Sequence, residues 1–221
     1  MAIVSADVAV TDRWFGITEH GELDLVSGDW ANGLIRVMSV GARVHTGIDI
    51  GPVRVTVDTH DTPPDRIDDS LPWDEIVEVS LAAPLGELRV DSPQTGPVME
   101  LPPLTPHGPG TYRLRIHARG RDASVHTVQG DLPPEEYLLT SWPAVPSPEL
   151  VIRLTDQCGY SRRLSHVKSS ASHPYREPPQ VAAQRQRQAQ LHQSILQGIA
   201  EQPSTTTPPT SSTPWPPPPA T

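Results

Sequence analysis

Cysteine and long apolar runs are almost absent from this sequence of 221 residues, and each absence narrows the class of protein. Cys158 is the only cysteine, so an internal disulfide is impossible and a reducing compartment is favoured. No stretch approaches the roughly 20 consecutive apolar residues that a membrane-spanning helix needs. The first residues also lack the positive start and apolar run of a signal peptide. The sequence therefore predicts a cytoplasmic protein with no membrane partner.

Recognisable catalytic and cofactor motifs are missing as well. The sequence has no Gly-x-Ser-x-Gly elbow, no glycine-rich phosphate loop and no His-x-His pair. The loop 60–69 gathers one histidine and four aspartates, but their spacing fits no calcium loop. Cys158 lies near Arg162 and Arg163, which would favour a thiolate, yet the sequence places no histidine beside it. We therefore predict no catalytic residue, no metal and no cofactor.

Charge and proline are unevenly distributed, and this divides the chain. Residues 1–157 hold 11 arginines against 24 Asp and Glu, a net charge of −13, whereas residues 158–201 carry a net +4. An acidic domain repels nucleic acid and suits a basic partner. Many of the 27 prolines lie in the last fifty residues. We predict a β-sandwich domain at 1–157, a linker at 158–179, a helix at 180–202 and a disordered Pro/Thr-rich tail at 203–221.

Alternation with a period of two is the main structural signal. Along 110–120, Tyr112, Leu114, Ile116 and Ala118 alternate with three arginines and a histidine, which indicates a strand with one apolar and one charged face. Residues 136–142 form a second strand, and we expect the two to pair at the centre of the domain. Short alternating segments between turn residues predict an all-β fold, an antiparallel β-sandwich of about eight or nine strands.

Six side chains are candidates for contact with a partner. The charged face of the 110–120 strand offers an anion-binding strip, and two tryptophans offer apolar contacts: Arg113, Arg115, Arg119, Arg121, Trp14 and Trp142. Trp14 and Phe15 must point to opposite faces if the backbone is extended there, so one of them lies outside the core. The alternative for the arginines is pairing with Glu or Asp on neighbouring strands.

The blocks 110–122 (GTYRLRIHARGRD) and 136–144 (EYLLTSWPA) resemble uncharacterised actinobacterial proteins that carry the same two blocks. The order of strands over 5–143 is also similar to the competence protein J family of β-rich nuclease inhibitors, with Gly110, Tyr112 and Tyr137 at corresponding positions. This resemblance implies a non-catalytic protein-interaction module of the immunity or nuclease-inhibitor type, with a basic nuclease or toxin as partner. A ligand-binding sandwich or an enzyme of unrecognised type is the alternative, and the sequence leaves the oligomeric state open.

Overall fold

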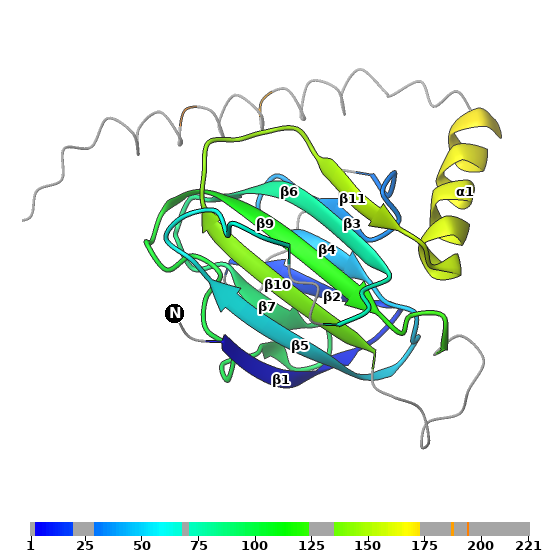
Figure 1. The fold of residues 1–221 in the computed structure, drawn as a ribbon, viewed down its shortest axis with the longest axis horizontal. Helices are drawn as coiled ribbons and strands as arrows, with labels where there is room; N and C mark the ends of the chain where they lie inside the picture. The colour runs from blue at the N-terminus through cyan, green and yellow to red at the C-terminus, as the bar shows by residue number, and fades with distance from the viewer. Residues whose placement is uncertain are drawn as a thin grey trace, which may run out of the picture.

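The structure, a computed structural model, describes residues 3–19, 29–67, 71–123 and 135–172, together with Arg187 and Ser194. Eleven strands in this part form two packed sheets, so the predicted all-β sandwich is confirmed (Figure 1). The six-stranded sheet has the order β1 (Ile3–Val10), β5 (Gly51–Thr59), β10 (Glu136–Pro143), β9 (Gly110–Arg119), β6 (Glu75–Ala83) and β11 (Leu150–Leu154). The five-stranded sheet has the order β3 (Ile35–Val37), β4 (Ala42–His45), β2 (Trp14–Thr18), β7 (Arg89–Ser92) and β8 (Gly96–Pro97).

The two sequence blocks form β9 and β10, which pair antiparallel in the middle of the six-stranded sheet, as predicted. Neighbouring strands are antiparallel throughout this sheet except at one place, where β10 runs parallel to β5. Inward side chains of both sheets form one core, in which Val55, Leu114, Ile116 and Phe15 have no exposed surface. The alternation of β9 and β5 therefore sets which residues face the second sheet.

The hairpin of β3 and β4 shows why one glycine is needed. Gly41 has a φ of 78°, and its carbonyl accepts a hydrogen bond from the amide of Met38 at 3.0 Å. A Cβ at Gly41 would lie 2.1 Å from the carbonyl oxygen of Ile17 in the neighbouring β2. Both the positive φ and the close approach exclude other residues, so this glycine turn fixes the edge of the five-stranded sheet.

One helix, α1 (Gln157–Ser172), follows the last strand, and it occupies most of the segment predicted as a linker. Two aspartates cap the start of this helix. The side chain of Asp122 accepts hydrogen bonds from the backbone amides of Gln157 and Cys158, and that of Asp156 accepts one from the amide of Gly159 at 2.7 Å. Aspartate is a strong helix N-cap, which explains why a helix starts despite Gly159. The helix predicted at 180–202 and the tail at 203–221 lie outside the described residues, apart from Arg187 and Ser194. None of the described helical segments has the length and apolarity to cross a membrane.

Candidate functional site

The outward face of the six-stranded sheet is covered by other segments rather than left open to solvent. Arg113, Arg115 and His117 of β9 point to this face, yet each is less than a tenth exposed. The loop between β5 and β6 crosses it, and the backbone carbonyl of Arg66 in this loop accepts a hydrogen bond from Arg115 at 3.1 Å. A second small core forms there between Trp73 and residues of the strands and loop: Ile76, Leu138, Ile67 and Ile152. The predicted charged face is thus an interior layer.

Acidic neighbours hold the arginines of this face. Glu78 on β6 accepts a hydrogen bond from Arg113 at 3.2 Å through one carboxylate oxygen and one from Arg115 at 2.7 Å through the other. The side chain of Glu78 is only 10% exposed. Arg119 pairs with Glu136 of β10 at 2.8 Å. Trp142 lies near the guanidinium of Arg115, 5.3 Å from it to the ring centroid. Cross-strand pairing with acids, the alternative weighed for these residues, is what the structure shows.

A hollow of about 570 Å³ remains between the crossing loop and the sheet. Its floor runs over β1, β5, β10 and β9, and its apolar walls come from both the strands and the loop: Ile3, Ile67, Leu71, Trp73 and Leu138. This volume lies within the range of sites that take small ligands or side chains of a partner. We call this hollow the sheet groove.

Polar groups reach the sheet groove at a few points. Asp58 of β5 lies 2.7 Å from the imidazole of His60, and both side chains are about one-sixth exposed. Arg115 and Thr140 lie on the floor. The sheet groove therefore offers an apolar surface with both a carboxylate and hydrogen-bond donors at its edge. This combination orients a ligand that has apolar and polar parts.

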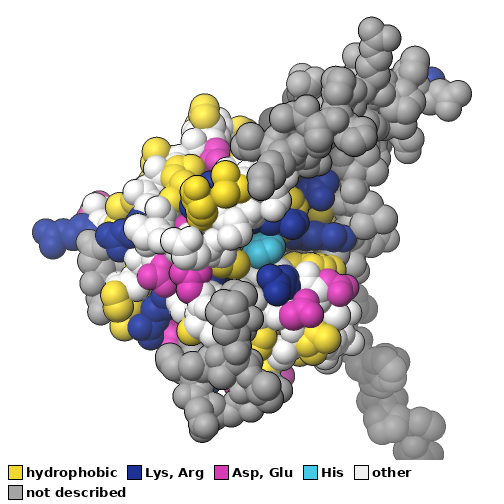
Figure 2. Space-filling view, turned by 90° about the vertical axis from the view of Figure 1, so that its right-hand side faces the viewer, with side chains coloured by type: hydrophobic (Ala, Val, Ile, Leu, Met, Phe, Trp, Pro, Cys, Tyr) yellow, Lys and Arg dark blue, Asp and Glu magenta, His cyan; other side chains and the backbone are white. Residues whose placement is uncertain are grey.

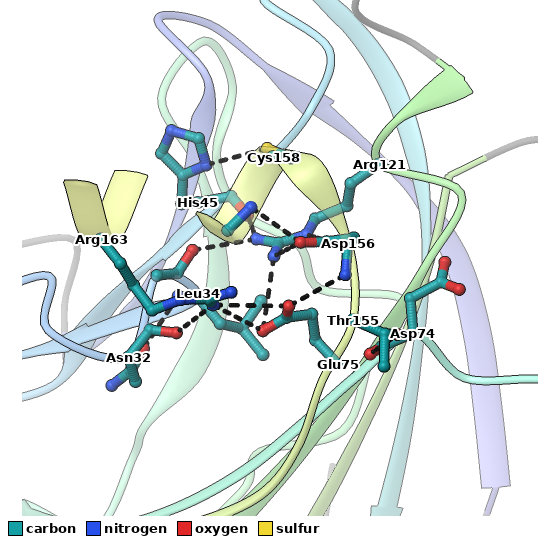
Figure 3. A network of polar contacts seen from close by, with 12 residues as sticks. Asn32, Leu34, His45, Asp74, Glu75, Arg121, Thr155, Asp156, Cys158 and Arg163 are labelled. Atoms are coloured by element: carbon teal, nitrogen blue, oxygen red, sulfur yellow. Dashed lines mark hydrogen bonds and ion pairs between the residues drawn. The ribbon is translucent and has the colours of Figure 1, made fainter. Parts of the chain in front are cut away.

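A separate polar network joins the two sheets to α1 (Figure 3). Arg121 follows β9 in the chain and is fully buried; it makes a bidentate pair with Asp156 at 2.6 and 2.9 Å and lies 3.8 Å from Glu75. Its guanidinium also donates to the carbonyls of Gly33 and His45, which belong to the five-stranded side. Burial and the nearby Asp156 raise the pKa of Glu75 to about 8. The predicted partner contact Arg121 thus lies in the interior and connects three parts of the fold.

The same network brings a histidine to the only cysteine. The Sγ of Cys158 lies 3.6 Å from Nδ1 of His45, at the start of α1. Burial raises the pKa of Cys158 to about 11 and, with the positive charge of Arg121, lowers the pKa of His45 to about 3. At neutral pH this pair is a thiol beside a neutral imidazole. A thiolate, the form that attacks a substrate, is therefore disfavoured at this position.

Sequence reasoning missed the residues that make the sheet groove. Trp73 and Leu138 gave no signal beyond apolarity, and the 60–69 loop was considered only as a metal site. No group of three or more His, Cys, Asp or Glu within the described part of the chain is arranged to hold a metal ion, and Asp68 and Asp69 lie outside that part. Trp14 and Phe15 point to opposite faces, as expected, and the structure places Phe15 in the core and Trp14 on the outer face of the five-stranded sheet. The predicted residues therefore fall on three separate regions rather than one.

No family model matches this sequence, and no curated protein matches it either. Two solved structures are similar in fold. One is described as crocagin biosynthetic gene J, with a TM-score of 0.43, 18% identity, and coverage of 65% of this chain and 99% of that chain. The other is ComJ from Bacillus subtilis, described as an inhibitor of the DNA degrading activity of NucA, with a TM-score of 0.45, 11% identity, and coverage of 63% of this chain and 95% of that chain. The predicted weak resemblance to competence protein J is confirmed.

Proposed function

We propose that the protein is a non-catalytic binding module that takes a segment of a partner protein in the sheet groove. The carrying observation is the groove itself: an apolar hollow of about 570 Å³ on a sheet face whose other side chains are paired or covered. Exposed apolar surface rimmed by polar groups marks interaction sites in proteins. Ile3, which is 70% exposed, extends the apolar surface to the edge strand β1.

The partner that we propose is basic. The acidic excess of −13 over residues 1–157 supports this, because opposite charges on two proteins speed their association. Near the groove, Asp61 and Asp65 stand in the crossing loop, and Asp61 is 81% exposed on its side chain. A nuclease that binds DNA through a basic cleft belongs to this class of partner. Inhibition of a nuclease is the specific form of the proposal.

A small ligand is the second candidate, and the size of the groove favours it. Hollows of several hundred Å³ with apolar walls and a few polar groups are the usual sites for small molecules. The close pair of Asp58 and His60 would then fix the ligand's orientation. Both candidates use the same floor, so one substitution tests both.

The test fills the floor of the groove. Thr140 is 5% exposed on the outward side of β10, and Thr140→Trp would place an indole in the hollow. Met99→Trp, at a side chain that is 68% exposed, is the matched control. Peptides selected from a displayed random library on the wild-type protein are then measured by calorimetry. We expect binding that Thr140→Trp weakens at least roughly tenfold and that Met99→Trp leaves unchanged.

Two results would overturn the proposal. If no peptide is enriched and a library of small-molecule fragments gives no shifts of groove residues in NMR spectra, the groove binds neither class. If Thr140→Trp retains full binding, the selected ligands lie elsewhere. Inhibition is tested separately by following DNA cleavage by NucA with and without the protein. Unchanged cleavage would contradict inhibition of this nuclease, whereas the peptide experiment decides separately whether the groove binds a partner segment.

A further inference from the structure

The wall of the sheet groove contains a hydrogen-bond donor that has no acceptor. Trp73 lines the groove and is 5% exposed, and its Nε1–H is buried and donates no hydrogen bond among the residues that the structure describes. The carboxylate of Asp58, which could act as an acceptor in the groove, is already engaged by His60 at 2.7 Å. A buried donor without an acceptor costs free energy. The groove therefore favours an occupant that is apolar and rich in free carbonyl oxygens.

One segment of this chain has the matching chemistry. The segment 214–219 (PWPPPP) carries a tryptophan between prolines and has no charged side chain. Proline has no N–H, and a run of prolines favours the polyproline II helix, whose carbonyl oxygens make no internal hydrogen bonds. Segments of this kind bind in grooves that aromatic side chains line. Trp215 is also the only aromatic or large aliphatic residue in 203–221, so it is the residue that can fill an apolar hollow.

The chain between α1 and this segment is long enough to reach the groove. Trp215 follows Ser172, the last residue of α1, by 43 residues. Even at the short helical rise of about 1.5 Å per residue this length covers about 65 Å, against roughly 40 Å across a domain of this size. Residues 158–201 also carry a net charge of +4 against −13 for residues 1–157. Opposite charge therefore draws the connecting part of the chain towards the domain.

The surface beside α1 has a different character from the groove. The helix lies at one end of the sandwich (Figure 1), and Figure 2, seen from that side, shows a row of basic side chains beside a histidine. A segment without charge forms no ion pair with these side chains, so this end gives it no electrostatic anchor.

We propose that segment 214–219 occupies the sheet groove of its own chain and competes there with the partner. Trp215 packs between the apolar walls beside Trp73 and Leu138, and a backbone carbonyl of the proline run accepts the indole N–H of Trp73. This inference rests on the proposed function, because it takes the groove to be a binding site. It adds that the groove is self-inhibited until a tighter-binding partner segment displaces the prolines.

Weak affinity is enough for an occupant that is tethered to its site. A tethered segment has an effective concentration of about 1 mM. With a dissociation constant of about 0.1 mM, it fills about nine-tenths of the grooves and weakens the binding of a partner about tenfold. A polyproline helix also loses little conformational entropy when it binds, which favours binding by so short a segment.

The experiment compares the full chain with its Trp215→Ala variant and follows the indole N–H signals by NMR. We expect the Trp73 signal to differ between the two proteins, whereas the signal of Trp14, on the other sheet, stays in place. A synthetic peptide of residues 203–221, added to Trp215→Ala, should bind saturably and restore the wild-type position of the Trp73 signal. The same peptide with alanine in place of its tryptophan should not. In the Trp215→Ala background, Thr140→Trp should abolish the saturation and the surface control Met99→Trp should retain it.

A second measurement separates this inference from the proposed function. Library peptides that bind the groove should bind Trp215→Ala about tenfold more tightly than the wild type, since the competitor is gone. Pro208→Ala, which lies outside 214–219, is the matched control and should leave their affinity unchanged. Circular dichroism verifies that each variant is folded.

Three results distinguish the outcomes. If library peptides bind the wild type and Trp215→Ala equally and the 203–221 peptide does not saturate, self-occupation is wrong and partner binding stands. If no library peptide binds either protein, the proposed function is wrong, and the titration with the 203–221 peptide alone decides self-occupation. If light scattering shows a mass that doubles with concentration in the wild type but not in Trp215→Ala, the segment enters a second copy and occupation within one chain is wrong.

Discussion

The two outer faces of the sandwich carry arginines in opposite electrical settings. On the six-stranded sheet, Arg113 and Arg115 share the carboxylate of Glu78, and covering segments exclude water. On the five-stranded sheet, Arg43 lies opposite another arginine and stacks on Trp14, with no acid beside it among the described residues. Arginines of the first kind are held by a buried carboxylate, whereas Arg43 is held by its stacking on an indole. The same residue type on two similar sheets therefore has different roles.

Arg121 extends this comparison into the interior, because it lies between two buried carboxylates. The effect of a substitution should grow with how deeply the ion pair that it breaks is buried. On this basis the Arg121 network comes first and the arginines of Glu78 come second, and the change of stability with pH is the smallest effect. The predictions below follow this order.

The largest effect is expected for Arg121→Leu. This change leaves the carboxylate of Asp156 without its counter-charge in a buried place and removes donors to the carbonyls of Gly33 and His45. Breaking a buried ion pair by removing one partner costs about 3–5 kcal/mol of unfolding free energy. Urea unfolding followed by tryptophan fluorescence measures it. Arg54→Leu, at a half-exposed pair with Asp7, is the control and should cost less than about 1 kcal/mol. A loss below that value at Arg121 would contradict the role assigned to it.

A smaller but still large effect is expected for Glu78→Gln. The amide keeps the shape of the side chain but leaves Arg113 and Arg115 without a counter-charge under the covering segments. We expect a loss of about 2–3 kcal/mol, because a charged hydrogen-bond partner is removed from a buried site. Arg43→Gln on the other sheet is the matched control, and it should change stability by no more than about 0.5 kcal/mol because it also relieves repulsion from Arg36. Equal losses of unfolding free energy in Glu78→Gln and Arg43→Gln would contradict the difference that we infer between the arginines of the two sheets.

The fold could be predicted because alternation specifies which side of a strand faces the core. The apolar set of β9 points inward as expected, and so do Val53, Val55 and Val57, which alternate with polar residues in β5. Alternation does not say whether the other side meets water. That depends on the loop after β5, whose Trp73 packs on His117 at 5.3 Å between ring centroids, a contact between residues far apart in the sequence. Of the residues that line the sheet groove, the sequence therefore pointed to Arg115 but not to Trp73 or Leu138.

The start of α1 did have a local signal. Thr155 and Asp156 precede the helix, and an aspartate in this position is a usual N-cap. Gly159 obscured it, since glycine is a poor helix former. The structure gives the reason for this glycine: a Cβ there would lie 2.7 Å from the guanidinium of Arg121. Tertiary packing around Arg121 thus decides a residue that propensity alone makes unfavourable.

The smallest effect concerns pH, and it separates the interior network from both outer faces. With a folded-state pKa of about 8 against an ordinary 4.5, Glu75 holds a proton in the folded protein that the unfolded chain releases, so its contribution to stability is complete below pH 4.5 and is lost as pH rises through 8. His45, with a pKa of about 3 against 6.5, has the opposite effect, and its contribution is complete above pH 6.5. Above pH 6.5, the only remaining change is the loss of stability that the raised pKa of Glu75 causes.

We therefore expect the free energy of unfolding to fall by about 1–2 kcal/mol between pH 6.5 and 8. Glu75→Gln should flatten this fall, because the amide cannot release a proton. Urea unfolding at several pH values measures the free energy of unfolding of the wild type and of Glu75→Gln. Glu78→Gln is the control, and we expect it to lower stability without flattening the fall. A wild-type stability that rises over this range would mean that Arg121 and Arg163 keep Glu75 ionised, and the network would then resemble the paired face of the six-stranded sheet rather than differ from it.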